Sequence, residues 1–257
     1  MAQVSRRKVI EGIGLGLPLA AILADPVLAA AAASELEDVS ISTASGKKVK
    51  AALARPDKKN APAVLLVHEW WGLNDQIKSV AREVSKLGYL ALAIDLYDGN
   101  VTDDANTARA YMKATNQKEA TETVAAWGQW LKSHTSGTGK VGSVGWCFGG
   151  GWSLNSALVT PLDCAVVYYG RVDKKAEQLA SLNGPVLGHF ATRDQWINRQ
   201  MVSAFEAQMN KAGKQFSSHW YEADHAFANP TSARYDQQDA QLAWQRTTDF
   251  FKTNLSS

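Results

Sequence analysis

Cysteine is scarce in this chain, because its 257 residues include only two, Cys147 and Cys164. Two cysteines are too few for a disulfide framework, and no Cys/His cluster has the spacing of a metal site. A glycine-rich dinucleotide-binding fingerprint is also missing. We therefore expect neither a metal nor an organic cofactor. Cys164 lies in an apolar run, and we interpret it as a buried residue. In an oxidising compartment, a disulfide between Cys147 and Cys164 is an alternative, although it would disable the thiol of Cys147.

Basic runs are missing beyond the extreme N-terminus, and the formal net charge is only +2. This balance argues against nucleic acid as the main partner. Internal repeats and low-complexity segments are absent after residue 33. With 46% hydrophobic residues, the chain can instead bury one large core. We expect a single domain over residues 34–257 and a monomer.

The N-terminus lacks an apolar run of membrane-spanning length, because Pro18 and Asp25 interrupt it. Arg6 and Arg7 precede this weakly apolar stretch, and small residues suited to signal cleavage follow it at 29–33. Paired arginines before such a segment resemble a bacterial twin-arginine signal, which exports folded protein. We predict a signal peptide over residues 1–33, a periplasmic location, and membrane contact only through the export signal. A membrane anchor is the alternative interpretation.

Apolar runs of strand length alternate with helix-length segments along the rest of the chain. Two alternating segments joined at Ser45-Gly46, 39–43 and 48–54, predict an antiparallel hairpin. Buried strands are expected at 63–67, 89–94, 140–144, 162–169, 186–190 and 216–221, with a loop at 136–139. Helices are expected at about 75–87, 102–114, 119–132, 151–159, 176–182, 197–212 and 232–253. This alternation predicts an α/β fold, a doubly wound and mostly parallel sheet with an N-terminal antiparallel hairpin.

The strand predicted at 140–144 leads into Gly145-Trp146-Cys147-Phe148-Gly149-Gly150, and a helix is expected from residue 151. Strand, glycine-flanked nucleophile and helix together describe a nucleophile elbow. Side chains at Gly145 and Gly149 would collide with the neighbouring backbone in so tight a turn. The N–H groups and positive dipole end of the helix would favour the thiolate of Cys147. A buried cysteine in a glycine-rich turn is the alternative interpretation.

Four side chains able to do chemistry follow predicted strands: Glu69, Cys147, Asp194 and His225. Parallel strands end at one edge of the sheet, so these residues are expected to converge there. The chain order of nucleophile, acid and histidine is that of α/β-hydrolases. His225 would exchange protons with the thiol and the leaving group, while Asp194 would orient the imidazole and stabilise its charged form. Taken singly, the aspartate could be a turn former and the histidine an ordinary surface or core residue.

The chain resembles the dienelactone hydrolase family, whose fold is that of the α/β-hydrolases, over nearly all its length after the signal. The resemblance rests on six motifs: Ala54-Arg55-Pro56, His68-Glu69-Trp70-Trp71-Gly72-Leu73-Asn74, Asp95-Leu96-Tyr97, Gly145-Trp146-Cys147-Phe148-Gly149-Gly150, His189-Phe190-Ala191-Thr192-Arg193-Asp194 and Asp224-His225-Ala226-Phe227. It implies a triad of Cys147, Asp194 and His225. It also implies a glutamate, Glu69, that interacts with the resting thiol and helps to deprotonate it when substrate binds. Such a device suits a thiol, because a permanent thiolate is easily oxidised. A salt-bridged loop carboxylate is the alternative for Glu69.

The oxyanion hole is expected to consist of two backbone N–H groups. Elbow geometry assigns one of them to Phe148, and the family resemblance assigns the other to Trp70. Aromatic residues in or near these segments would line the substrate pocket. These pocket candidates are Trp71, Trp146, Tyr97, Trp196 and Phe227.

The sequence departs from the family where substrate recognition is concerned. The resemblance implies two arginines that hold the carboxylate of a dienelactone, one just after residues 95–97 and one just after residues 225–227. This chain has Asp98-Gly99 and Ala228-Asn229 there. Losing bidentate carboxylate contacts should weaken selection for acidic lactones. Arg193 or Arg199 could substitute.

The sequence therefore predicts a hydrolase that cleaves a small-molecule ester or lactone through an acyl-cysteine intermediate. Two alternatives stay open: a thiol-based redox or peroxide-responsive protein, and a non-catalytic, ligand-binding relative with the same fold. The lack of a well-placed resolving cysteine counts against the first alternative. The presence of all three triad members counts against the second.

Overall fold

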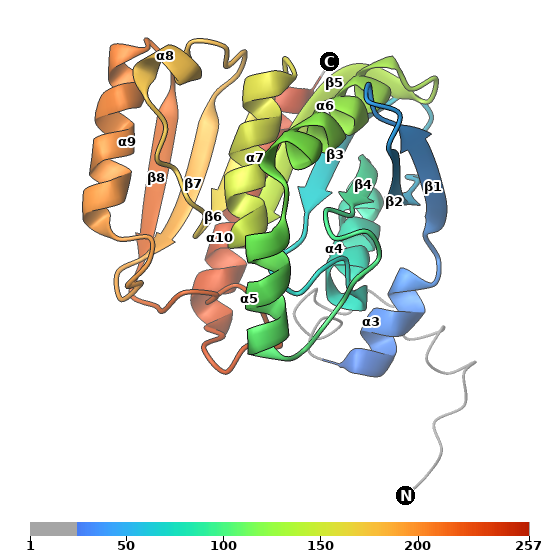
Figure 1. Ribbon diagram of the computed structural model, residues 1–257, viewed down its shortest axis with the longest axis horizontal. Helices are drawn as coiled ribbons and strands as arrows, with labels where there is room; N and C mark the ends of the chain where they lie inside the picture. Colours follow the sequence, from blue (N-terminus) through green and yellow to red (C-terminus); the bar gives the residue numbers. More distant parts are fainter. Residues whose placement is uncertain (1–24, 257) are drawn as a thin grey trace, which may run out of the picture.

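The computed structural model describes residues 25–256, which form an eight-stranded sheet with helices on both faces (Figure 1). The strands are β1 (Glu37–Ser42), β2 (Lys48–Ala54), β3 (Ala61–Val67), β4 (Leu90–Ile94), β5 (Gly137–Trp146), β6 (Cys164–Tyr168), β7 (Val186–Ala191) and β8 (Phe216–Tyr221). Their order in the sheet is β1-β2-β4-β3-β5-β6-β7-β8. The pairs β1–β2 and β2–β4 are antiparallel, and all the others are parallel. This confirms the predicted α/β fold with its N-terminal hairpin.

Helices cover both faces of the sheet. They are α3 (Pro26–Ala33), α4 (Asp75–Lys86), α5 (Ala105–Ala114), α6 (Gln117–Ser133), α7 (Phe148–Val159), α8 (Ala176–Leu179), α9 (Arg199–Lys211) and α10 (Gln237–Leu255). Helices α6, α7 and α9 pack on one face, and α4 and α10 pack on the other (Figure 1). None of the helices described over residues 25–256 is long and apolar enough to cross a bilayer.

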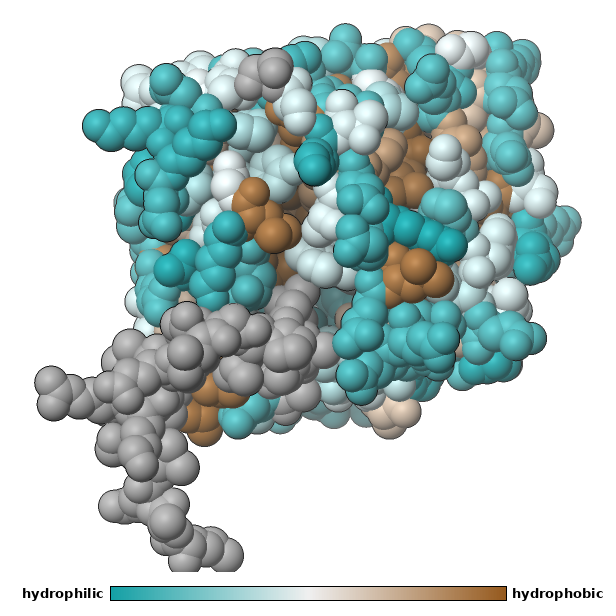
Figure 2. Space-filling view, turned by 180° about the vertical axis from the view of Figure 1, so that it is seen from behind, coloured by the Kyte–Doolittle hydropathy of each residue, from teal (hydrophilic) through white to brown (hydrophobic). Residues whose placement is uncertain are grey.

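Strand β3 shows why the central strands are apolar at every position. Leu65 belongs to the core under α6 and α7, whereas Leu66 belongs to the core under α4 and α10. Alternate side chains thus enter two separate cores, as expected for a parallel strand covered on both faces. The outer surface behind the sheet is mostly hydrophilic, with apolar side chains in small patches between polar ones (Figure 2).

Several predicted boundaries were wrong. Residues 137–139 were expected in a loop but begin β5, because Gly137 already pairs with Ala61 of β3. The last helix begins at Gln237 rather than near Ser232, because the Asp236 side chain caps it by accepting a hydrogen bond from Asp239 N. Helix α7 begins at Phe148, three residues before the expected start, so the nucleophile turn is even tighter than the sequence indicated.

The predicted signal peptide falls mostly on residues 1–24, which lie outside the described residues. Its last part, 26–33, forms α3, which begins at Pro26 and is capped by the Asp25 side chain. Helix α3 packs against α4 and buries Ala29, Ala32 and Ala33. Cleavage after residue 33 would therefore remove a helix that contacts the domain.

Candidate active site

Cys147 occupies a strained turn between β5 and α7. Its φ is 55° and its ψ is −117°, a conformation that residues with a side chain rarely adopt. A Cβ on Gly145 would lie 2.0 Å from the carbonyl oxygen of Gly149, and a Cβ on Gly149 would lie 2.2 Å from that of Val67. The two glycines flanking Cys147 are therefore required by the close approach of β3, β5 and α7. The sulfur stands at the N-terminus of α7, where the helix dipole favours an anion.

Asp194 and His225 come together although 31 positions separate them in the chain. The His225 ring nitrogen Nδ1 lies 2.6 Å from Asp194 Oδ2. The other carboxylate oxygen, Oδ1, accepts hydrogen bonds from the backbone N–H groups of Trp196 and Ile197, at 2.8 and 3.0 Å. Asp194 is thus held rigidly after β7, and it fixes the orientation of the ring that follows β8.

The protonation preferences of this pair follow from their contacts. Burial of the His225 ring opposes its positive charge, but the hydrogen bond to Asp194 and the nearby Cys147 side chain, with the charges of both, raise the pKa of His225 to about 10. Burial also opposes the charge of Asp194, yet His225 and the two backbone N–H groups hold the pKa of Asp194 below its ordinary value. The site therefore favours an imidazolium between a carboxylate and the sulfur.

Glu69 is buried after β3, and its two carboxylate oxygens have different partners. Tyr169 Oη donates to Oε1 at 3.1 Å, and Asn229 Nδ2 donates to Oε2 at 2.7 Å. Burial is the largest influence and raises the pKa of Glu69, although those two donors and the nearby charges of His225 and Arg234 oppose it. Within residues 25–256, Glu69 makes no ion pair and no hydrogen bond to the Cys147 thiol. The expected contact with the resting thiol is therefore absent, since both oxygens are engaged elsewhere.

Sequence reasoning missed the two residues that hold Glu69. Tyr169 follows β6 with a φ of 35°, and its ring centroid lies 5.1 Å from that of His225. Asn229 accepts hydrogen bonds from Thr231 N and Oγ1 through its Oδ1 while its amide nitrogen donates to Glu69. The rule that functional residues follow parallel strands could have flagged Tyr169. Sequence analysis identified Asn229 only as a residue that stands where the family resemblance implies an arginine.

His68 joins the loop after β3 to the loop after β4. Its Nε2 accepts a hydrogen bond from Leu96 N at 3.1 Å, so its Nδ1 carries the proton and donates to the carbonyl oxygen of Glu69. Because the ring is fully buried, the desolvation of its charged form lowers the pKa of His68. A neutral His68 thus fixes the backbone next to Trp70.

The two expected oxyanion donors are free to act. The backbone N–H groups of Trp70 and Phe148 donate to no oxygen of residues 25–256. Phe148 is the first residue of α7, where backbone N–H groups have no partner inside the helix.

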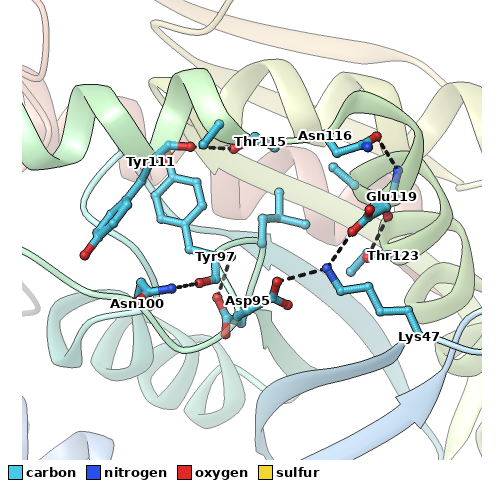
Figure 3. Close-up of a pocket in the computed structure, with 13 residues that line it drawn as sticks. Lys47, Asp95, Tyr97, Asn100, Tyr111, Thr115, Asn116, Glu119 and Thr123 are labelled. Atoms are coloured by element: carbon cyan, nitrogen blue, oxygen red, sulfur yellow. Dashed lines mark hydrogen bonds and ion pairs between the residues drawn. The ribbon is translucent and has the colours of Figure 1, made fainter.

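The five aromatic pocket candidates lie in different surroundings. Trp196 is 62% exposed, and its ring centroid lies 5.2 Å from that of His225, while Trp71 packs on Trp70. Trp146 and Phe227 are buried in the core under α4 and α10, and their assignment to the pocket stays a prediction. Tyr97 is buried and lines a cavity between the loop after β4 and the start of α6 (Figure 3).

The two cysteines are both free, and the sheet keeps them apart. Cys164 opens β6 opposite Gly142, five residues before Cys147, which corresponds to roughly 16 Å along the strand. A disulfide between them is therefore excluded in this fold. Among residues 25–256, no group of three or more His, Cys, Asp or Glu side chains could hold a metal ion.

The dienelactone hydrolase family model matches residues 49–255, which include every residue of the site. The chain belongs to the dienelactone hydrolase family. It is 28% identical over 228 residues to the carboxymethylenebutenolidase of Pseudomonas putida, covering 83% of this chain and 95% of that protein. Carboxymethylenebutenolidase 1 of Cupriavidus pinatubonensis is 26% identical over 223 residues, covering 83% of this chain and 95% of that protein.

The fold is also that of a dienelactone hydrolase-like promiscuous phosphotriesterase, P91, known from metagenomic libraries. The TM-score is 0.78 at 20% identity, and the match covers 86% of this chain and 100% of that one. Family membership and fold together make the protein a hydrolase of the ester or lactone type.

Both arginines considered as substitutes for the family's carboxylate-binding pair have side-chain partners in the structure. The Arg193 side chain donates from Nε to Asp224 Oδ2 at 3.3 Å. The guanidinium carbon of Arg199 lies 4.4 Å from the ring centroid of Trp220 in β8. Asp98, one of the residues at the expected arginine positions, instead pairs with Lys47.

Proposed function

We propose that the protein cleaves an uncharged ester or lactone through a triad of Cys147, His225 and Asp194. The observation that supports this most strongly is the 2.6 Å contact between His225 and Asp194 beside a cysteine at a strained elbow. A structural cysteine gains nothing from a costly backbone conformation, whereas a nucleophile gains exposure and the field of the helix N-terminus.

Acyl transfer would proceed in two halves. The Cys147 thiolate attacks the carbonyl carbon, and the resulting oxyanion accepts hydrogen bonds from the N–H groups of Phe148 and Trp70. The intermediate collapses when His225 gives its proton to the leaving alkoxide, which leaves an acyl-cysteine and a neutral imidazole. A water then gives a proton to His225 as it attacks the acyl carbon, and the acid leaves as the thiolate re-forms.

We assign Glu69 a role in controlling the thiol rather than in acyl transfer itself. Its buried carboxylate lies within the field of His225, and its pKa is raised, so it can accept a proton more readily than an exposed glutamate. In the structure Tyr169 and Asn229 occupy its oxygens. Glu69 would act on the thiol only after substrate displaces one of these donors.

The same proposal predicts weak turnover of acidic lactones. Asn229 supplies a neutral amide where the family resemblance implies an arginine, and Asp98 adds a negative charge at the other position. A carboxylate on the substrate would therefore lose bidentate recognition. A muconate-type lactone should be a poor substrate, and its efficient cleavage would contradict this part of the proposal.

The test is a panel of neutral esters assayed with the wild type, Cys147→Ala and Cys164→Ala. Turnover should disappear in Cys147→Ala and persist in Cys164→Ala, because the second thiol is buried far from the site. Thiol-dependent consumption of peroxide without ester cleavage would support a redox protein instead.

We also propose that the protein is exported through a twin-arginine signal, because Arg6 and Arg7 precede a weakly apolar segment. The measurement is fractionation of cells that express the wild type or an Arg6→Lys, Arg7→Lys variant. Periplasmic protein should be lost in the variant. N-terminal sequencing of the mature form will show whether α3 is retained, and equal export of both forms would refute the signal.

A further inference from the structure

The indole of Trp196 lies at the protein surface directly beside the histidine of the triad. Trp196 is 62% exposed, and among residues 25–256 it is the only aromatic residue in the set of large apolar side chains that are mostly exposed. Single exposed apolar side chains are common on proteins, so exposure alone does not indicate a function. What sets Trp196 apart is how it is held.

Three contacts fix Trp196 next to the catalytic pair. Its backbone N–H donates to Asp194 Oδ1 at 2.8 Å. Its ring centroid lies 5.2 Å from that of His225, and the two ring planes meet at 76°. The guanidinium carbon of Arg234, in the loop between β8 and α10, lies 5.7 Å from the indole centroid, within the range of a cation–π contact. The indole is thus held in place before a ligand arrives, which lowers the entropic cost of binding to it.

The His225 ring has a buried neighbour and an exposed one. The fully buried ring of Tyr169 has its centroid 5.1 Å from that of His225, and the exposed neighbour is Trp196. Because Nδ1 of His225 is engaged with Asp194, its Nε2 must carry the proton to the leaving alkoxide. The alcohol oxygen therefore comes within hydrogen-bonding distance of Nε2. A group one carbon away from that oxygen can reach the exposed indole.

The chemistry of this position favours an aromatic group over the alternatives. A cationic alcohol would meet the guanidinium of Arg234 and the protonated ring of His225, and both would repel it. An aliphatic alcohol would bury apolar area on the indole, whereas an aromatic ring also gains the ring–ring interaction.

We propose that the indole of Trp196, supported by Arg234, binds the leaving alcohol of the substrate, and that this alcohol carries an aromatic ring close to the ester oxygen, as in a benzyl ester. The inference rests on the proposed function, because it names the class of alcohol that the same site releases.

The test compares benzyl acetate with cyclohexylmethyl acetate, whose alcohols differ in aromaticity. Both esters give the same acetyl-enzyme, so a difference in kcat/KM arises before the alcohol leaves. The ratio of kcat/KM, benzyl over cyclohexylmethyl, should fall about fivefold in Trp196→Leu, which corresponds to about 1 kcal/mol. Trp196→Phe should keep most of the wild-type ratio. A ratio that Trp196→Leu leaves unchanged would overturn the inference.

Trp220 in β8 offers a matched control variant. It also has an arginine over its ring, with the guanidinium carbon of Arg199 4.4 Å from the centroid, but it packs on Phe190 in the core under α6, α7 and α9. Trp220→Leu should therefore keep the wild-type ratio. An equal fall in Trp196→Leu and Trp220→Leu would contradict the inference.

Two isomeric esters show which half of the substrate meets Trp196. Benzyl propionate carries its ring in the alcohol, and ethyl phenylacetate carries it in the acyl part. Trp196→Leu should lower kcat/KM about fivefold for benzyl propionate and leave ethyl phenylacetate unchanged within twofold. An equal loss for both isomers, or a loss only for ethyl phenylacetate, would overturn the assignment to the leaving alcohol.

A binding measurement distinguishes failure of this inference from failure of the proposed function. Cys147→Ala cannot form an acyl-enzyme, so ligand-observed NMR can follow the binding of benzyl acetate without turnover. Binding that weakens about fivefold when Trp196→Leu is added, and persists when Trp220→Leu is added, supports the inference even if the wild type cleaves no ester. Binding that is absent from Cys147→Ala, or that Trp196→Leu leaves unchanged, overturns it.

Discussion

Two buried carboxylates flank the nucleophile, and the structure treats them in opposite ways. Asp194 is 5% exposed and Glu69 is 3% exposed, so burial opposes the charge of both. Asp194 faces the cationic ring of His225 and two backbone N–H groups, and its pKa is lowered. Glu69 receives hydrogen bonds from the neutral side chains of Tyr169 and Asn229, and its pKa is raised.

Burial opposes the charge of both carboxylates, and only the partners of Asp194 are strong enough to reverse its effect on the pKa. The β7–β8 side of Cys147 is a closed arrangement with an ion pair already made. On the β3–β4 side, the hydrogen bonds of Glu69 come from neutral donors, Tyr169 and Asn229, and can be exchanged for others. We interpret the first side as the permanent catalytic pair and the second as the side that responds to substrate.

Removing the charge of Asp194 on the β7–β8 side should have the largest effect on kcat. Asp194→Asn removes the charge that orients and stabilises the His225 imidazolium, so kcat should fall by about 10³- to 10⁴-fold. Steady-state kinetics on a neutral ester will measure it, with Asp224→Asn as the control, because Asp224 pairs with Arg193 at the surface. A loss below about tenfold would mean that Asp194 has a structural role only.

Removing the charge of Glu69 on the β3–β4 side should lower kcat less. Glu69→Gln keeps the size of the side chain but cannot accept a proton, and we expect a fall in kcat of about 10²-fold. The rate at which Cys147 reacts with iodoacetamide should also change. If both the kinetics and the alkylation rate match the wild type, Glu69 has no part in the mechanism.

Giving Glu69 a charged partner would make the two sides alike. Asn229→Arg should lower the pKa of Glu69 and raise kcat/KM for an anionic lactone by about tenfold, because a guanidinium pairs with a carboxylate. Asn229→Gln, which is longer but neutral, is the matched control. An equal gain in both variants would show that length rather than charge is responsible.

The smallest expected effect is on the dependence of thermal stability on pH. The pKa of His225 in the folded protein, about 10, lies above its ordinary value of 6.5. The protonated ring therefore contributes its full stabilisation below about pH 6.5, and this contribution is lost as the pH rises toward 10. Asp194, with a lowered pKa, stays ionised throughout this window. The difference in Tm between wild type and Asp194→Asn should therefore shrink between pH 6 and pH 10 by about 3 °C. A constant difference would mean that the ion pair does not stabilise the fold.

Much of the fold follows from local sequence pattern. The apolar run at 63–67 predicts a strand covered on both faces, and the glycines at 145 and 149 predict the tight turn. Helix starts that depend on one cap, such as Asp236 before α10, were less certain, because several polar residues nearby could cap equally well.

The catalytic side of the site was more predictable than the responsive side. Cys147, Asp194 and His225 each follow a strand, so topology alone brings them together. The hydrogen bonds that Tyr169 and Asn229 donate to Glu69 span 100 and 160 positions, and no local pattern indicates them. The cavity escaped prediction for the same reason, since its wall combines the hairpin turn, the β4 loop and two helices.

The most direct test of the account is intact-protein and peptide mass spectrometry after rapid quenching with a slowly turned-over ester. The account predicts that the mass of one acyl group appears transiently on the peptide containing Cys147, and that Cys147→Ala shows neither the adduct nor turnover. Ester cleavage that continues in Cys147→Ala, with no acyl adduct on the wild type, would contradict it.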